Sequence, residues 1–277
     1  MTHFLYTPPG PLSRVVQCFW YWEGAPTGHT KERLMPTGEA SVIFNLRDEP
    51  IRIYNWRNLN QYETYGTAVL AGARSEPFAI DTQQQERVFG IQFQPGGSFP
   101  FFHVPSSEVV NLDVPLECVW RTAADTMRTR LLEAGSVPAM LAVAEEELLR
   151  QLVRPLELHP AVAFAAQRFT ANPHRTTVAC VLDSIGLSHR RFSQLFQEQT
   201  GLAPKVFCRV RRFQRVLSSL NKMRRFEWAQ IALDCGYYDQ AHFIHDFQSF
   251  SGFTPTSYAE GVFARPEENR HMNHVPL

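Results

Sequence analysis

The sequence of 277 residues has no excess of charge of either sign, few cysteines and no long apolar run. No stretch reaches the roughly 18–20 apolar residues that cross a membrane, so we expect no membrane span. No basic start followed by an apolar segment is present at the N-terminus, so we expect no signal peptide. The cysteines form no CxxC pair, which argues against a zinc knuckle and a disulfide framework and favours reduced thiols in a cytoplasmic protein. They are Cys18, Cys118, Cys180, Cys208 and Cys235.

The balance of charge conceals two halves of opposite sign. Residues 1–159 carry 13 Lys and Arg against 18 Asp and Glu, whereas residues 160–262 carry 12 against 7. This asymmetry predicts two modules with different partners. Arginine supplies 24 of the 27 basic residues, so sites that need a planar fork of donors are well supplied.

The pattern of apolar residues changes along the chain. Short runs such as residues 41–46, 52–54 and 88–93 are separated by turn signals, which predicts a small β-barrel or sandwich. After Pro115 the apolar period becomes helical, and Glu145, Glu146 and Glu147 are expected to face the solvent. We therefore predict an α+β multidomain chain. Its parts are a β-rich domain (1–120), a helical segment (121–157), an all-α domain (158–262) and a flexible tail (263–277).

An internal repeat is the most informative feature of the basic half. Residues 186–204 and 236–255 share two Phe, a Gly and a Pro, and each pair lies 51 positions apart, as Gly201 and Gly252 do. The glycines of the two turns, Gly186 and Gly236, lie 50 apart, so the second turn is one residue longer. Each copy is interpreted as a helix, a glycine turn and a second, capped helix that buries two phenylalanines. Such a unit is either a DNA-reading helix-turn-helix or an ordinary helical hairpin. Two copies in a basic segment favour the first interpretation.

The residues of this repeat resemble the DNA-binding domain of the AraC/XylS family of bacterial transcription regulators. The resemblance covers about a third of the chain and rests on residues 186–188 (Gly-Leu-Ser), 231–237 (Ile-Ala-Leu-Asp-Cys-Gly-Tyr), the Phe243 and Phe247 pair, and residues 252–255 (Gly-Phe-Thr-Pro). It implies two helix-turn-helix units joined by a linker helix. Residues 34–38 and 93–97 are similar, less specifically, to the cupin-like regulatory domain of the family, and the helical segment lies where the family places its dimer contact.

In a helix-turn-helix, the exposed early positions of the second helix read base edges. The predicted base-facing residues are His189, Arg190, Ser193, Gln194, Gln240, Ala241 and His245. Relatives often carry Arg where this chain has Gln194 and His245, which leaves the base preference open. Contacts to phosphate are predicted for Arg191, Lys205, Arg209, Arg211, Arg212, Arg215 and His242. About half of these arginines are expected to touch DNA. The spacing of His242 and His245 is too loose for a zinc site, so we expect no metal and no cofactor.

Aromatic and basic residues of the β-rich domain are candidates for an effector pocket, or alternatively for the core. They are Trp20, Trp22, Arg33, Tyr54 and Trp56. The sequence thus predicts a transcription regulator and not an enzyme. Its expected partners are an operator in double-stranded DNA, RNA polymerase, an unknown small-molecule effector and a second copy of the chain. The alternatives are a cupin-like enzyme with a helical docking module, for which no catalytic constellation is visible, and a DNA-binding regulator without a ligand.

Overall fold

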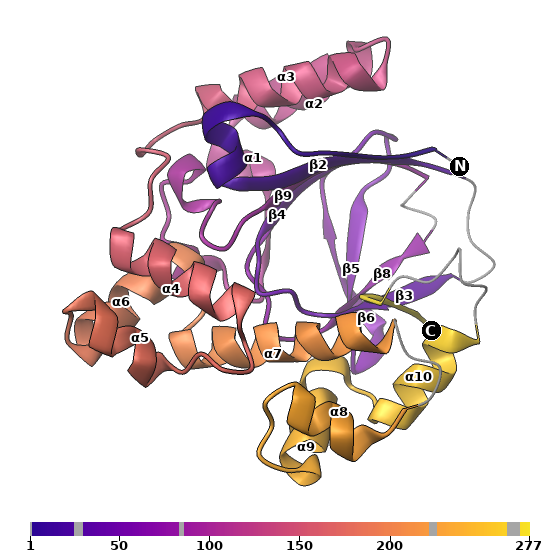
Figure 1. Cartoon of the computed structure of the whole chain (residues 1–277). Helices are drawn as coiled ribbons and strands as arrows, with labels where there is room; N and C mark the ends of the chain where they lie inside the picture. Colours follow the sequence, from indigo (N-terminus) through magenta and orange to yellow (C-terminus); the bar gives the residue numbers. More distant parts are fainter. Residues whose placement is uncertain (1, 25–29, 83–85, 222–225, 265–271) are drawn as a thin grey trace.

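The computed structural model describes residues 2–24, 30–82, 86–221, 226–264 and 272–277. Two antiparallel sheets form the N-terminal part (Figure 1). In order across the first sheet lie β1 (Thr2–Tyr6), β2 (Val16–Glu23), β9 (Arg87–Phe93), β4 (Ser41–Asn45), β7 (Ala68–Ala71) and β10 (Asp113–Pro115). The second sheet contains β11 (His274–Pro276), β3 (Lys31–Leu34), β8 (Phe78–Asp81), β5 (Ile51–Asn55) and β6 (Asn58–Tyr65).

Three helices cover the outer face of the first sheet. They are α1 (Leu116–Trp120), α2 (Thr122–Glu133) and α3 (Val137–Arg150). Side chains alternate across a strand, so Phe19 and Phe89 point to the helices, where they share a core with Met127 and Leu148 of α2 and α3. The predicted helical segment is confirmed, and its apolar stripe is the face that is buried.

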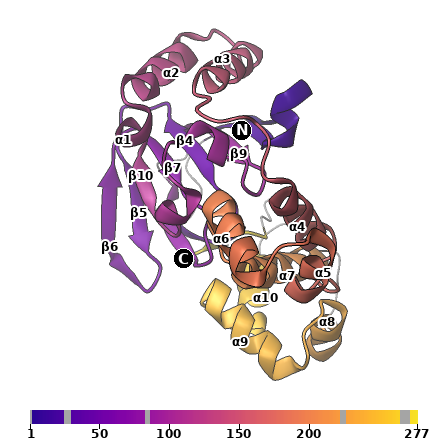
Figure 2. The same ribbon diagram turned by 90° about the vertical axis from the view of Figure 1, so that its left-hand side faces the viewer.

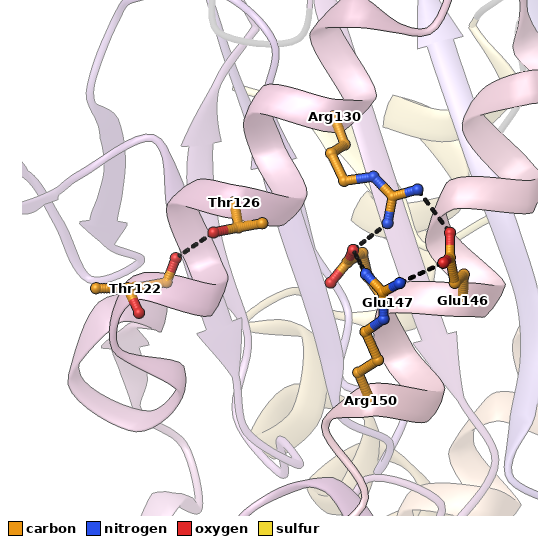
Figure 3. A network of polar contacts seen from close by, with 6 residues as sticks. All are labelled: Thr122, Thr126, Arg130, Glu146, Glu147 and Arg150. Carbon is orange, nitrogen blue, oxygen red and sulfur yellow. Dashed lines mark hydrogen bonds and ion pairs between the residues drawn. The ribbon is translucent and has the colours of Figure 1, made fainter.

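The expectation that all three glutamates of residues 145–147 face the solvent is wrong for Glu147. Glu147 is buried, with 3% of its surface exposed, because it lies on the same side of α3 as Ala144 and Leu148. Arg130 of α2 and Arg150 of α3 both donate to its carboxylate, and both also pair with Glu146 (Figure 3). A buried carboxylate is tolerated when such donors surround it.

The remaining helices form a second domain with its own core. They are α4 (Pro160–Ala171), α5 (Val178–Ile185), α6 (His189–Thr200), α7 (Pro204–Leu220), α8 (Trp228–Asp234), α9 (Gln240–Ser251) and α10 (Pro255–Phe263). Figures 1 and 2 show them on the opposite side of the sheets from α2 and α3. The predicted linker helix is confirmed as α7, a helix of 17 residues with Pro204 in its first turn.

The expectation of a flexible tail is wrong for residues 272–277. Residues 274–276 form β11, which pairs with β3 at the edge of the second sheet. Val275 is buried in the core of the helical domain, and His274 lies 2.9 Å from the carboxylate of Glu32. The hydroxyl of Tyr258 in α10 donates to the carbonyl of Met272. The apolar side chain and these polar contacts tie the end of the chain to both domains.

Candidate DNA-binding surface

The first helix-turn-helix unit consists of α5 and α6. Thr177 caps α5, Gly186 ends it at a φ of 66°, and Ser188 caps α6 by accepting from the amide of Arg191. Phe192 and Phe196 are fully buried. Because the helix buries this face, its other face is left to the solvent. His189, Arg190 and Gln194 are exposed there and Ser193 is half-buried, as a DNA-reading surface requires.

The second unit, α8 and α9, repeats this arrangement. Asp239 caps α9 by accepting from the amide of His242, and Phe243 and Phe247 are buried. Gln240, Ala241 and His245 are exposed on the early part of the helix. The caps and glycine turns predicted from the repeat are therefore confirmed. The extra residue of the second turn is accommodated before Asp239, which lies 51 positions after Ser188.

Most of the predicted phosphate contacts are accessible. Arg191, Lys205 and Arg215 are exposed, and His242 is exposed with its imidazole 3.8 Å from the carboxylate of Asp246. Arg212 is half-buried, with its guanidinium 5.2 Å from the centre of the Tyr237 ring.

Two of the predicted phosphate contacts are instead engaged within the protein. Arg209 pairs at 2.7 Å with Asp246, a buried residue of α9, and Arg211 pairs at 2.7 Å with Glu39 of the N-terminal domain. Arg211 also donates to the carbonyl of Thr37. Both arginines have carboxylate partners because α7 lies between α9 and the N-terminal domain, so that two of its faces meet acidic residues. The sequence contains no sign of either partner.

The C-terminal ends of both reading helices rest on the N-terminal domain. Gly201 and Gly252 follow α6 and α9 at φ values of 91° and 73°. A Cβ at Gly201 would lie 3.1 Å from the Cβ of Ala73, and one at Gly252 would lie 2.6 Å from the ring of Trp56. The equivalent glycines of the two repeats are thus points where each unit meets the N-terminal domain, and neither glycine tolerates a side chain without displacement.

The candidate effector residues lie in three different places. Tyr54 and Trp56 line a surface groove of about 490 Å³ between the β5–β6 hairpin and residues 74–78 and 111–113. Arg33 lies at the domain contact, where it donates to the carbonyls of Trp56 and Ser251. Trp20 covers Gly90 on the face of β2 opposite Phe19 and Tyr21, and Trp22, which shares this face, lies with its ring 5.6 Å from that of His3. The structure therefore brings only Tyr54 and Trp56 together in the groove.

The described part of the chain contains neither a cluster of metal-ligating side chains nor a helix that could span a membrane. Within residues 2–24, 30–82, 86–221, 226–264 and 272–277, no three His, Cys, Asp or Glu side chains are grouped to hold a metal ion. No helix in those ranges is long and apolar enough to cross a membrane.

Two helix-turn-helix units on one linker helix, behind an antiparallel β domain, define a DNA-binding transcription regulator. Residues 181–261 match the family described as Helix-turn-helix domain, and residues 5–115 match the Domain of unknown function (DUF6597). The C-terminal part of the chain therefore contains a helix-turn-helix domain, and the N-terminal part contains a DUF6597 domain.

Similar solved structures include that of ToxT from Vibrio cholerae O395 bound to (E)-4-(8-methylnaphthalen-1-yl)but-3-enoic acid. It is 8% identical, with a TM-score of 0.47, and the match covers 93% of this chain and 98% of ToxT. Wild-type ToxT from Vibrio cholerae strain SCE256 with a bound unsaturated fatty acid is 12% identical, with a TM-score of 0.42 and coverage of 88% and 93%. No curated protein matches the sequence.

Proposed function

We propose that the protein recognises an operator by placing α6 and α9 in successive major grooves of double-stranded DNA. The observation that carries this proposal is the pair of reading helices that expose their polar N-terminal halves while their C-terminal ends contact the N-terminal domain. At about 1.5 Å per residue, the 17 residues of α7 span roughly 25 Å, which suits reading helices about one DNA turn apart. The base-facing residues are His189, Arg190, Ser193, Gln194, Gln240, Ala241 and His245.

The phosphate contacts of this proposal come from the side chains that remain accessible. They are Arg191, Lys205, Arg212, Arg215 and His242, without Arg209 and Arg211, which carboxylates of the protein already neutralise. Each phosphate that a basic group neutralises releases counterions, so the affinity for DNA should fall steeply as salt is added.

We also propose that the protein forms a homodimer and that it binds a small-molecule effector. On α3, Ala139, Ala142 and Leu149 are exposed on the same side as Glu146, and this mixed apolar and charged face is where we place a second copy of the chain. The effector would occupy the groove beside Tyr54 and Trp56. Because Trp56 also packs on Gly252 after α9, a ligand that moves this ring would move a reading helix. We further propose that the protein acts in the cytoplasm, where it recruits or hinders RNA polymerase, and that it has no enzymatic activity.

Selection of bound sequences from random double-stranded DNA tests the proposal. Enriched sequences with two short motifs about one helical turn apart are the expected result, and the logarithm of the affinity should decline linearly with the logarithm of the salt concentration. A matched protein with Arg190→Ala and Gln240→Ala should lose the enrichment while it remains folded. Failure of the wild-type protein to enrich any sequence, together with an affinity that does not depend on salt, would overturn it.

A further inference from the structure

We propose that His174, Arg175, Arg212 and Arg215 form a phosphate-binding site at the junction of the two helix-turn-helix units, which holds the DNA backbone between the two major grooves. The inference rests on the proposed binding of DNA. It adds a site outside the reading helices, and two of its members, His174 and Arg175, are not among the phosphate contacts proposed above.

The two units touch at this junction through their backbones. His174 and Arg175 lie in the loop between α4 and α5, and Gly236 lies in the turn between α8 and α9. A Cβ at Gly236 would be 2.6 Å from the carbonyl oxygen of His174 and 2.7 Å from its Cα. Gly236 has a φ of 81°. The loop of the first unit and the turn of the second are therefore in direct contact, so a ligand bound here contacts both units at once.

Positive charge gathers around this contact. Arg209, Arg212 and Arg215 follow one another at a spacing of three along α7, and therefore lie near one face of the helix. Asp246 neutralises Arg209, whereas none of the ion pairs among the described residues involves Arg175, Arg212 or Arg215. Desolvation lowers the pKa of His174, and the nearby charges of Arg215 and Arg175 lower it further. Among the described residues, the junction thus presents three arginines that form no ion pair, while Asp234 and Asp246 lie close enough to act on the neighbouring Cys235 and Tyr237.

Unpaired polar atoms are concentrated at the same place. Seven buried side-chain nitrogen or oxygen atoms of the described residues have no hydrogen-bond partner, and three of them are Nδ1 of His174, Nε of Arg212 and the hydroxyl of Tyr237. Buried polar groups normally find partners, so each unpaired one calls for an explanation. The Arg212 guanidinium lies 5.2 Å from the centre of the Tyr237 ring. An anion at the exposed guanidinium groups of Arg175 and Arg215 would supply the missing negative charge.

A phosphate of the DNA backbone is the anion that fits the position of the site. When two reading helices on one linker occupy successive major grooves, the backbone of the intervening minor groove passes the part of the protein that joins them. Here that part is the junction. Arginine suits this contact because its fork of donors matches the geometry of a phosphate. Such a contact carries no base information, so it fixes the position of the two units on the duplex.

The first test measures the affinity for a duplex recovered by the selection described above, as a function of salt. For Arg175→Ala and Arg215→Ala together we expect an affinity at least about tenfold lower, an unchanged sequence preference, and a salt slope reduced by about 0.9 for each lost phosphate contact. The charge-preserving variants Arg175→Lys and Arg215→Lys should retain most of the slope. Arg14→Ala removes one positive charge from an exposed position in the N-terminal domain and should leave binding unchanged.

The second test replaces single phosphates of that duplex by uncharged methylphosphonates. The affinity of the wild-type protein should fall when a linkage between the two recognised motifs is made neutral. The affinity of the double variant should not fall further at that linkage, because its contact to the phosphate is already lost. Equal salt slopes for wild type and double variant, or equal sensitivity of the two to the central linkages, would overturn the site while the proposed function stands. If the wild-type protein fails to bind any duplex, the proposed function fails as well.

Discussion

The guanidinium of Arg211 donates to the carboxylate of Glu39 across 2.7 Å and so joins the linker helix α7 to the N-terminal domain. The side chains of Arg211 and Glu39 keep only 18% and 8% of their surface exposed. Burial raises the pKa of Glu39, while Arg211 and a hydrogen bond from Gln92 act in the opposite direction. The placement of the DNA-binding domain on the sheets thus includes a charge pair in which each domain supplies one partner.

Removing one member of this pair should destabilise the protein strongly. For Glu39→Ala we expect a loss of about 3 kcal/mol in the free energy of unfolding, because the charge of Arg211 stays largely buried without its partner. Arg211→Ala should have a similar effect, and the double variant should cost less than the sum of the two. Urea unfolding of the four proteins measures the coupling. Glu157→Ala, which breaks an exposed pair with Arg14, should change stability by less than about 1 kcal/mol and serves as the control. Additive effects at Glu39 and Arg211 would contradict the pairing.

The raised pKa of Glu39 also predicts a dependence of stability on pH. A carboxyl group whose pKa is higher in the folded protein binds its proton more tightly when folded. Its contribution is therefore most favourable below the unfolded pKa and is lost as the pH rises through the folded pKa. Relative to Glu39→Gln, which does not titrate, the wild-type protein should lose stability as the pH rises above about 4.3, the ordinary pKa of an unfolded glutamate. Unfolding at several pH values checks this sign. A relative gain of the wild type with rising pH would mean that Arg211 outweighs desolvation.

Base reading by the first unit should depend on Arg190. This arginine is exposed near the start of α6, and a bidentate contact to guanine accounts for about 1–3 kcal/mol of discrimination against the wrong base. Arg190→Ala should lower the affinity by that amount and relax the preference at one operator position. Arg191→Ala should weaken all sequences alike, because a phosphate contact does not read bases. Competition among single-base variants of the selected operator distinguishes the two. Identical preferences for wild type and Arg190→Ala would place the reading face elsewhere.

Local signals in the sequence were sufficient for much of the DNA-binding domain. A cap such as Ser188 or Asp239 and a glycine such as Gly186 act within one turn of helix, so the repeat predicts the helix starts, the turns and the exposed faces. The strands at residues 41–46, 52–54 and 88–93 were likewise predicted, and they correspond to β4, β5 and β9.

Contacts between distant segments account for what the sequence did not reveal. Glu147, Arg209 and Arg211 were each expected at the surface, and each is held by a partner at least 17 positions away on another element. Residues 274–276 became a strand because the edge of β3 was available to pair with them. Nothing within a window of a few residues distinguishes these positions from solvated ones.

The contact between Trp56 and the end of α9 is tested by comparing two glycines. Gly186 and Gly252 have similar positive φ values of 66° and 73°, but a Cβ at Gly186 meets no atom within 4 Å, whereas one at Gly252 meets the Trp56 ring at 2.6 Å. Gly186→Ala should therefore cost only the strain of the left-handed conformation, about 1–2 kcal/mol.

Gly252→Ala should cost that strain and a further 1–3 kcal/mol or so for the collision with the ring. Urea unfolding of both variants measures the difference. Adding Trp56→Ala removes the ring and leaves, of the three nearest atoms, only Nη1 of the flexible Arg33 side chain close to the added Cβ, at 2.7 Å. The double variant should therefore be more stable than the sum of the two single changes implies, whereas Trp56→Ala should leave the effect of Gly186→Ala unchanged. Equal costs at the two glycines, or no coupling between Trp56 and Gly252, would mean that α9 does not rest on this ring in solution. The route from the groove to the reading helix would then have to pass through Arg33, which donates to the carbonyl of Ser251 at the end of the same helix.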